Sequence, residues 1–556
     1  MTVSAMNVEK QGAPATGPDG VKTLDIAIVG AGVAGLYAIY KYRAQGFAVA
    51  AFEAGSDVGG TWYWNRYPGA RIDVESAEYS YTFSDELRRE WRWSERYASQ
   101  AELHEYLKFV AERLDLRPHI TFDTRVTRIL FDAERAEWTL YSAAGPLCRA
   151  RFCVMATGFL SAPNMPNIPG IGDFGGEVYH TSCWPKTPVD LTGKRVGVVG
   201  TGSSGVQLIP KVAEQAGTLT VFQRTANFCI PLRNRPLSDD YRQYQDGTFD
   251  AWKDISTRSF GAFHYVNFEL SEPNPRSALE VSEAERLAEY EFRWNSGGLC
   301  YFTSFKDLMF DAGANESLAD FVREKVREKV EDPETREALV PRDHPIMAKR
   351  LCGDTNYYET FNQPHVTLVD VRKNPIDRIA AAGVVAGGRE YPLDVLIFAT
   401  GFDAGTGAMT RMDIQGRDGR TIKDHFSDGP RNVLGMMAAG FPNMFIIDGP
   451  GSPGAFYNPI LLSELQIDWF GRCMDYMRDN GICAIEATAE AEEEWVSHSR
   501  AICDNSLFSK AKSWYVGVNI EGRRMGPQLY MGGIVEYSRR LTDAEADGYA
   551  IFAKSR

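Results

Sequence analysis

Two glycine-rich turns constrain the fold of this chain more than any other feature. The first, GAGVAG over 30–35, follows the apolar run 24–29 and leads into a helical stretch that ends near Ala44. A second strand-like run, 48–52, ends at Glu53. Glycines let a backbone approach a pyrophosphate closely, and a helix N-terminus offers free N–H groups to the same anion. This strand–turn–helix–strand unit predicts a dinucleotide-binding fold.

The second turn, GTGSSG over 200–205, repeats that arrangement. It follows the strand-like run 195–199 and precedes a helical stretch and another strand at 219–222. Further strands are expected at 365–371 and 395–398. Strands that alternate with helices are typical of parallel sheets. We therefore predict the α/β class, with two Rossmann-like dinucleotide-binding domains and an inserted helical region.

The residue after the second strand of each unit distinguishes the two nucleotides. Glu53 lies 23 residues after Gly30, and a carboxylate there accepts hydrogen bonds from ribose hydroxyls and repels a 2′-phosphate. Arg224 lies 24 residues after Gly200 and is followed by Thr225. A cation at this position suits a 2′-phosphate, so we expect FAD in the first domain and NADPH in the second. Two such nucleotides imply hydride transfer from nicotinamide to flavin.

Composition limits the setting and the partners. The 556 residues are enough for two to four domains, and the net charge of −14 argues against wholesale binding to nucleic acid or to an anionic membrane. The nine cysteines are scattered, which favours a reducing compartment, and none has zinc-ligand spacing. No run approaches the ~20 apolar residues of a spanning helix. We expect a cytoplasmic, metal-free protein, monomeric or weakly self-associating, with small-molecule partners.

Changes of sequence character give the expected domain boundaries. A helix inside the inserted region has one apolar stripe from Leu318 to Val330, is predicted to be capped by Asn315, and ends at Asp332-Pro333. The run 443–448 is a further strand candidate, so the chain returns to its first domain. The expected segments are a flexible tail at 1–21, an FAD-binding domain at 22–162 and 393–556, an NADP-binding domain at 163–228 and 338–392, and a helical insertion at 229–337.

Two longer motifs identify a family. The stretch 174–185, FGGEVYHTSCWP, resembles the pattern FxGxxxHxxxW[PD] of the Baeyer–Villiger monooxygenases at every fixed position. The stretch 59–73 resembles their second pattern, [AG]GxWxxxx[FY]P[GM]xxxD. The ATG tripeptides at 156–158 and 399–401 also fit that family. The resemblance extends from about Leu24 to beyond Trp514.

This resemblance implies a reaction. Members of the family use NADPH and O2 to form a peroxide on FAD, and the peroxide attacks a ketone to give an ester or a lactone. The catalytic arginine of the family corresponds to Arg350, and Asp73 would pair with it. An arginine stays protonated, so it can stabilise a peroxide anion and the charge that develops on the carbonyl oxygen.

The resemblance also implies the remaining site residues. In the FAD and NADP sites it places Gly30, Gly32, Gly35, Glu53, Gly60, Thr61, Trp62, Arg71, Asp73, Tyr79, Val126, Thr201, Gly202, Ser203, Ser204, Gly205, Gln207, Arg224, Thr225, Lys349 and Trp514. The signature positions are Phe174, Gly176, His180 and Trp184, with His180 expected to relay or set domain orientation. Near an apolar substrate it places Val74, Leu160, Gly454, Ala455, Phe456 and Trp514.

Three alternatives are weighed against this interpretation. Oxygenation of amines or sulfides would use the same cofactors, but Asp73, Trp184 and Arg350 favour ketones. A disulfide reductase would need a cysteine pair beside the flavin. Cys148 and Cys153 are five residues apart in an expected strand, so we expect them on opposite faces. A non-enzymatic flavoprotein would have little use for two complete nucleotide sites.

Overall fold

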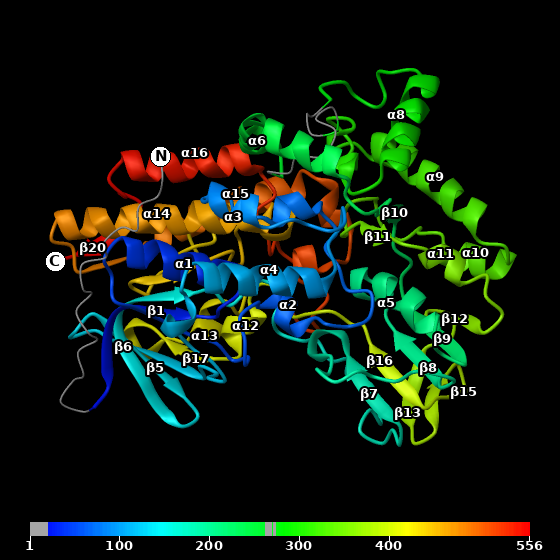
Figure 1. Cartoon of the computed structure of the whole chain (residues 1–556), viewed down its shortest axis with the longest axis horizontal. Helices are drawn as coiled ribbons and strands as arrows, with labels where there is room; N and C mark the ends of the chain where they lie inside the picture. Colours follow the sequence, from blue (N-terminus) through cyan, green and yellow to red (C-terminus); the bar gives the residue numbers. More distant parts are fainter. Residues whose placement is uncertain (1–19, 262–269, 271–273) are drawn as a thin grey trace.

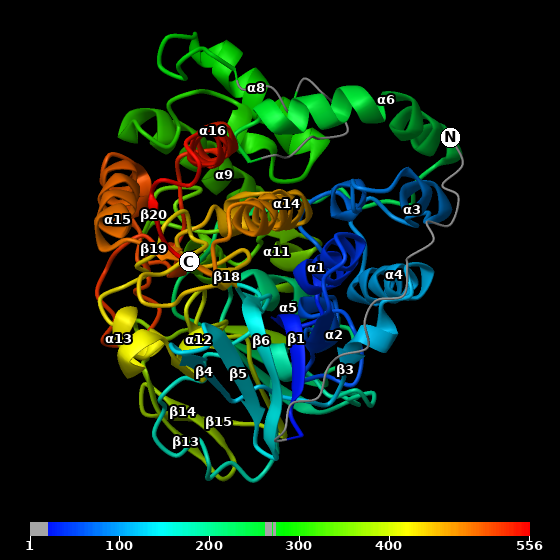
Figure 2. The ribbon, with the colours of Figure 1, turned by 90° about the vertical axis from the view of Figure 1, so that its left-hand side faces the viewer.

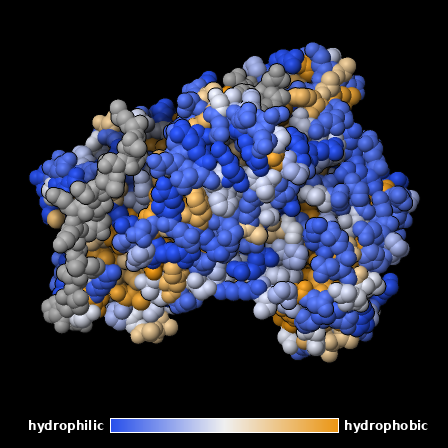
Figure 3. All heavy atoms as spheres, in the orientation of Figure 1, coloured by the Kyte–Doolittle hydropathy of each residue, from blue (hydrophilic) through white to orange (hydrophobic). Residues whose placement is uncertain are grey.

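The computed structural model describes residues 20–261, 270 and 274–556. The tail expected at 1–21 lies outside the described residues up to position 19. Figure 1 shows two sheets at the lower left and lower right, beneath a layer of helices. Figure 3 shows that this face is mostly hydrophilic and is hollowed between the two lower lobes. Within the described ranges, no helix is both long enough and apolar enough to cross a bilayer.

The first sheet combines strands from two distant parts of the chain. Its order is β17-β4-β5-β6-β1-β2-β3, and β18 pairs with β6. The strands are β1 (Lys22–Val29), β2 (Val49–Phe52), β3 (Ile120–Thr121), β4 (Arg128–Asp132), β5 (Glu137–Ser142), β6 (Gly145–Met155), β17 (Asp413–Gln415) and β18 (Met444–Ile446). Strands β2, β1, β6 and β18 run parallel, so their carboxyl ends meet at one edge of the sheet.

The second sheet is entirely parallel, in the order β12-β9-β8-β16-β7. Its strands are β7 (Glu177–His180), β8 (Arg195–Val199), β9 (Thr218–Gln223), β12 (Val366–Asp370) and β16 (Val395–Phe398). The boundary expected between 392 and 393 is wrong in one respect. Strand β16 fills the space between β8 and β7, so this domain extends to Phe398.

Helices cover the first sheet and bring the C-terminal part of the chain against it. Helix α1 (Val33–Ala44) packs beside α14 (Pro459–Asp479), as Figures 1 and 2 both show. Hydrogen bonds join them, since Tyr37 donates its hydroxyl to Asp468 at 2.8 Å and Gln45 donates to Asp475 at 2.9 Å. Further helices on this side are α4 (Gln100–Arg113), α15 (Ala489–Asp504) and α16 (Ile534–Ala546).

The expected helical insertion is present. It contains α6 (Asp239–Arg258), α8 (Glu283–Ser296), α9 (Ala312–Lys329) and α10 (Pro333–Leu339). The cap predicted for α9 is wrong: Asp311 accepts from Gly313 and Ala314 N–H at 2.8 and 2.9 Å. Asn315 instead lies inside the helix and donates to the Leu308 carbonyl at 2.8 Å. An aspartate at the N-cap satisfies the first amides, which frees the asparagine to tie the preceding loop.

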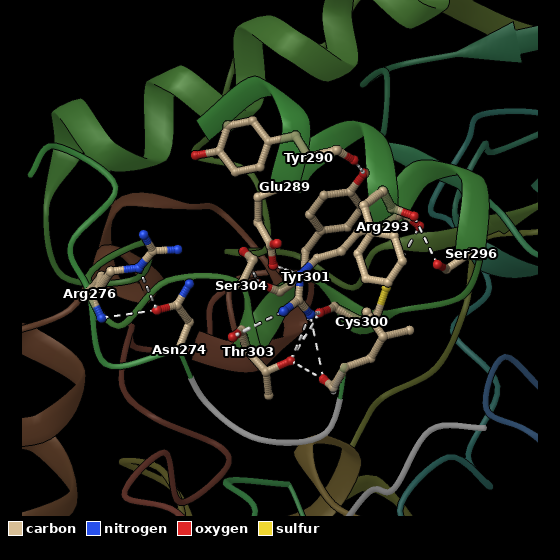
Figure 4. A network of polar contacts seen from close by, with 12 residues as sticks. Asn274, Arg276, Glu289, Tyr290, Arg293, Ser296, Cys300, Tyr301, Thr303 and Ser304 are labelled. Carbon is tan, nitrogen blue, oxygen red and sulfur yellow. Dashed lines mark hydrogen bonds and ion pairs between the residues drawn. The ribbon is translucent and has the colours of Figure 1, made fainter. Parts of the chain in front are cut away.

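A buried arginine holds this insertion together (Figure 4). Arg293, only 2% exposed, forms an ion pair with Glu289 at 2.6 Å and donates to Thr303 Oγ1 at 2.9 Å. The same guanidinium donates to the Cys300 carbonyl. A buried charge is tolerated only when it is paired and hydrogen-bonded. The network therefore fixes the loop after α8 against the helix and has a structural role.

The two cysteines of β6 lie in a strand that pairs with β1 in one continuous register, from Lys22 with Cys148 to Val29 with Met155. Both side chains are buried and belong to one large hydrophobic cluster. Both thiols are free, and burial raises the pKa of each. Cys148 pairs with Lys22, at the opposite end of β1 from the glycine turn. A redox pair beside a flavin is therefore not formed here.

Candidate active site

The first glycine turn is built by close backbone contacts. Gly30 has φ of +105°, and a Cβ atom there would lie 2.4 Å from the Ala156 carbonyl oxygen. A Cβ atom on Gly35 would lie 2.1 Å from the Gly30 carbonyl oxygen. Helix α1 begins after Gly32 without any side-chain cap. Its first N–H groups are thus available to an anion, as a dinucleotide pyrophosphate requires.

The second turn uses the same construction. Gly200 has φ of +108°, with a Cβ position 2.5 Å from the Ala399 carbonyl oxygen, and a Cβ on Gly205 would lie 2.3 Å from Gly200 O. Helix α5 (Ser203–Ala213) begins after Gly202 without a side-chain cap. A Cβ on Gly202 would meet nothing within 4 Å. Both ATG tripeptides therefore lie directly against a glycine turn, which explains their association with the nucleotide folds.

The residues that follow the second strands have different surroundings. Glu53 is 5% exposed, and its carboxylate accepts from Ala31 N–H at 2.9 Å and Gly55 N–H at 2.7 Å. Arg224 is exposed and lies near Lys349, whose pKa is lowered by burial and by that guanidinium. Within the described part of the chain, neither cation forms a salt bridge or hydrogen bond. The Asp343 carboxylate raises the pKa of Lys349 in part. Two neighbouring cations that make no salt bridge in the described residues suit a phosphate monoester.

The stretch 67–71 joins the two nucleotide folds. Tyr67 donates its hydroxyl to Gln207 Oε1 at 2.8 Å, and Gln207 Nε2 donates to the Arg71 carbonyl at 3.0 Å. Gly69 has φ of +84°, and a Cβ there would lie 2.4 Å from the Gln207 carbonyl oxygen. Gln207, expected in the cofactor site, thus has both ends of its amide engaged in this junction. The Arg71 guanidinium donates to the Tyr97 carbonyl at 3.2 Å.

The predicted catalytic pair is formed across this junction. The Arg350 guanidinium meets the Asp73 carboxylate through two parallel hydrogen bonds, Nε–Oδ2 at 2.9 Å and Nη2–Oδ1 at 2.7 Å. The two side chains are 18% and 23% exposed. Paired hydrogen bonds fix the plane of the guanidinium as well as its distance. The two partners are 277 residues apart in sequence, so only the folded chain brings them together.

One aromatic side chain of the C-terminal segment, Tyr515, lies near this pair. Burial raises the pKa of Tyr515, and the nearby Arg350 lowers it in part. No motif in the sequence marks Tyr515. Its ring lies 4.5 Å from that of Phe456, and the Trp514 ring lies 5.9 Å from Phe159. Phe456 is buried, and Val74, Leu160 and Trp514 are partly buried apolar residues on the same cluster. Gly454 adjoins Leu529, whereas the Ala455 side chain lies outside the described residues.

A second aromatic group lies beside the first glycine turn. A Cβ on Gly60 would be 2.9 Å from Gly32 Cα, so this glycine packs backbone to backbone on the turn. Trp62 follows in α2 (Thr61–Trp64) and meets the Tyr79 ring edge-on at 5.6 Å. The buried Trp62 indole N–H lies close to the Tyr79 hydroxyl and lowers its pKa in part, against the larger effect of burial.

Several other residues predicted for the cofactor sites contact groups of the protein itself. Val126 is buried in the hydrophobic cluster of the first sheet. In the second turn, Thr201 Oγ1 donates to the Thr225 carbonyl at 3.0 Å. Ser203 Oγ lies 3.6 Å from Cys352 Sγ, and Ser204 lies beside the Tyr67 hydroxyl.

The signature motif at 174–185 lies at the edge of the second sheet. Gly176 contacts the Asp394 carbonyl, with a Cβ position 2.3 Å away. His180 ends β7, and its Nδ1 lies 2.6 Å from Ser182 Oγ while its Nε2 lies 3.3 Å from Thr400 Oγ1. Burial lowers the pKa of this histidine. Trp184 packs on Tyr179 with ring centroids 5.2 Å apart. Phe174 is partly buried against a small three-stranded sheet made of β13 (Ile376–Ala380), β14 (Gly383–Ala386) and β15 (Arg389–Pro392).

The chain is similar in sequence and in structure to several known monooxygenases. The family model described as flavin-binding monooxygenase-like matches residues 23–235. Acetone monooxygenase (methyl acetate-forming) of Gordonia sp. is 41% identical over 96% of this chain and 99% of that protein. Phenazine N-monooxygenase of Lysobacter antibioticus is also 41% identical, over 95% of this chain and 97% of its own. A solved structure of an oxidized steroid monooxygenase bound to NADP is 47% identical with a TM-score of 0.90, covering 96% of this chain and 99% of that one.

Proposed function

Since this chain belongs to the flavin-binding monooxygenase-like family, and within it to the Baeyer–Villiger monooxygenases, we propose that it oxygenates an apolar ketone of substantial size. The enzyme uses FAD and NADPH, and it inserts one oxygen atom of O2 beside the carbonyl to give an ester or a lactone. The observation that carries the proposal for the site is the Arg350–Asp73 pair, held by hydrogen bonds of 2.9 and 2.7 Å.

The residues present fit both cofactors. FAD would lie on the glycine turn at 30–35, against the uncapped N-terminus of α1 and beside Glu53. NADP would lie on the turn at 200–205, with Arg224 and Lys349 at its 2′-phosphate. When bound, the pair supplies hydride transfer and O2 activation. The FAD-binding part then comprises 22–162 and the chain beyond Phe398.

Arg350 would act as the fixed cation of the reaction. It keeps its proton throughout, and Asp73 holds the guanidinium plane in a partly buried position. Negative charge that develops on oxygen during attack on the carbonyl is stabilised by such a preorganised donor. Asp73 would be a positioning residue, since its carboxylate oxygens are engaged by the arginine. The junction of Tyr67 and Gln207 would keep the two halves in register for this contact.

The residues that the family resemblance places near the substrate favour an apolar compound. Val74, Leu160, Phe456 and Trp514 supply apolar surface, and Tyr515 adds a buried ring. Apolar walls also exclude water, which would otherwise consume activated oxygen without product. The 47% identity to a steroid monooxygenase supports a bulky ketone, although an acetone monooxygenase is 41% identical. A panel from small to polycyclic ketones therefore covers the proposed class.

Product analysis tests this proposal. The holoenzyme is incubated with NADPH, ¹⁸O2 and the ketone panel, and products are identified by mass spectrometry. An ester or lactone carrying one labelled oxygen, with the highest kcat/KM for a large apolar ketone, is expected. A preference for small ketones would overturn the size assignment. NADPH consumption that yields only H2O2 with every ketone would overturn the ketone assignment.

Oxygenation of a heteroaromatic nitrogen is a second candidate. It is favoured by the phenazine N-monooxygenase, which is 41% identical over nearly the whole chain. The same incubation with phenazine-type heteroaromatics and with sulfides separates the two reactions. A labelled N-oxide as the main product, with no ester from any ketone, would favour this candidate. It would also remove the reason for a fixed cation, so Arg350→Ala would then retain N-oxide formation.

A further inference from the structure

Asp448 lies at the edge of the first sheet where the nucleotide turn also lies. Strands β1, β6 and β18 end side by side, because Val29 is in register with Met155 and Met155 with Ile446. Gly30 follows the first of these strands directly, and Asp448 follows the third after one further residue. Ligands of parallel sheets bind outside the carboxyl ends of the strands. Asp448 is therefore placed by topology beside the FAD groove.

The backbone at Asp448 is held in an uncommon conformation. Its φ is +50°, in the left-handed region, which aspartate tolerates better than most residues. Its N–H donates to Gln466 Oε1 at 2.7 Å, and Gln466 Nε2 donates to the Tyr537 hydroxyl at 2.7 Å. Gln466 is fully buried. Such a conformation persists only where neighbours enforce it, and these positions gather at functional sites.

The Asp448 carboxyl has an incomplete set of partners. Its Oδ1 is buried and has no hydrogen-bond partner in the described residues. Burial raises the pKa of the carboxyl to about 7, and the nearby Ser452 hydroxyl lowers it in part. The other titratable groups that face it are Tyr79, from the turn of helix at Ser76–Tyr79, and Tyr537, from α16. Neither carries a positive charge that would pair with a carboxylate.

Another buried carboxyl in the same half provides a contrast. Burial also raises the pKa of Glu464, in α14, to about 7. Both of its oxygens are nevertheless satisfied, because Thr82 donates its backbone N–H at 2.7 Å and its hydroxyl as well. Buried carboxyls with internal partners have a sufficient structural explanation. For Asp448, the Ser452 hydroxyl is close to the carboxyl, but Oδ1 has no hydrogen-bond partner in the described residues. Its neighbour Tyr79 is in turn close to Asp73 of the Arg350–Asp73 pair.

We propose that Asp448 is a ligand of the bound flavin nucleotide and that its charge sets the potential at which the flavin is reduced. The inference rests on the proposed function only in that FAD occupies the first glycine turn. The cofactor carries a polyol chain and polar ring edges, and these supply the hydrogen-bonding groups that the Asp448 carboxyl lacks. Reduction adds negative charge to the flavin, so a carboxylate beside it disfavours the reduced form.

The direction of the pH effect follows from this arrangement. Below about pH 6 the Asp448 carboxyl is neutral and leaves the potential unchanged. Above about pH 8 it is ionised, and the flavin of the wild-type enzyme becomes harder to reduce than that of Asp448→Asn. A tenfold change in the reduction equilibrium corresponds to about 30 mV for two electrons. We expect at least this tenfold difference at high pH and a difference below twofold at low pH.

The experiment compares the midpoint potential of bound FAD in wild-type, Asp448→Asn and Glu464→Gln holoenzymes. Redox dyes report the potential photometrically at about pH 5.5 and about pH 8.5, which bracket the carboxyl titration. We expect Asp448→Asn to differ from wild type only at the higher pH, and Glu464→Gln to match wild type at both. Equal potentials for wild type and Asp448→Asn at both values would overturn the proposal, as would an equal shift at both.

FAD affinity gives a second readout that does not depend on the potential. Asp448→Ala and Asp448→Ser are stripped of FAD and titrated with it, with far-UV circular dichroism as the test of folding. A folded variant whose FAD dissociation constant rises about tenfold supports a ligand role, whereas an unchanged constant contradicts it. Neither readout requires a ketone, so failure here is distinguishable from failure to find an ester.

Discussion

The two nucleotide folds of this chain share one backbone arrangement and differ in the side chain that follows the second strand, for which we propose a contact with the ribose. In each turn the first glycine lies against the carbonyl of an ATG alanine. A Cβ atom added to Gly30 or Gly200 would lie 2.4 or 2.5 Å from that carbonyl oxygen. Glu53, in the first fold, is buried and bonded to two backbone amides. Arg224, in the second, is exposed and unpaired within the described chain. The backbone geometry is thus common to both folds, and we propose that this one side chain selects the nucleotide.

The largest effect is expected where the two folds meet. Arg350→Ala removes the guanidinium that forms two hydrogen bonds with Asp73 of the first fold. Loss of a preorganised donor costs about 10²–10³-fold in rate. We expect ester formation to fall by at least that factor, while NADPH still reduces the flavin in an anaerobic stopped-flow experiment. Arg350→Lys keeps the charge without the bidentate geometry, so its rate of ester formation should lie between those of wild type and Arg350→Ala.

An Arg350→Ala enzyme that makes ester at nearly the wild-type rate would contradict the role of the pair. Arg378→Ala serves as the matched control, because Arg378 lies exposed on the small sheet beside the second fold. We expect its ester formation to stay within about twofold of wild type, as surface substitutions usually do.

Much of the fold follows from local pattern, because a glycine turn after an apolar strand has one common structural use. Strands at 195–199 and 395–398 and the helix after each turn are placed as predicted. Pairings over long sequence separation were beyond reach without the resemblance, as Arg350 with Asp73 illustrates. Tyr515 and Asp448 had no motif to mark them. The prediction that Asn315 caps α9 failed because two polar residues, Asp311 and Asn315, lie near the start of this helix. Only the geometry of the preceding loop shows that Asp311 is the cap.

Gly202→Ala tests whether the coenzyme binds against the second glycine turn without disturbing the packing of the fold. A Cβ at this position would meet nothing within 4 Å, and its φ of −77° is open to alanine. We expect the thermal midpoint to change by less than about 2 °C, because no packing is disturbed. KM for NADPH should rise about 10- to 100-fold if the pyrophosphate lies against this backbone. An unchanged KM would place the coenzyme elsewhere and break the likeness between the two folds.

Arg224→Ala tests the difference between the two ribose-reading positions. A guanidinium–phosphate contact contributes roughly 1.5–3 kcal/mol. We expect KM for NADPH to rise at least tenfold in steady-state kinetics, with KM for NADH changed less than twofold. Arg224→Lys should recover part of the loss, since it keeps the charge. Equal effects on both coenzymes would remove the assignment of the 2′-phosphate to this position.

The smallest effect is expected at the cysteines of β6, which test whether the first fold transfers electrons through sulfur. Cys148 lies at the Lys22 end of β1, away from the glycine turn, and burial raises the pKa of its thiol to about 12. A thiol with so little thiolate is a poor redox group. Cys148→Ala should therefore keep NADPH oxidation and ester formation within about twofold of wild type, with some loss of stability from the small cavity. A variant that stays folded but loses NADPH-dependent flavin reduction would instead indicate a disulfide-reductase chemistry in this half of the molecule.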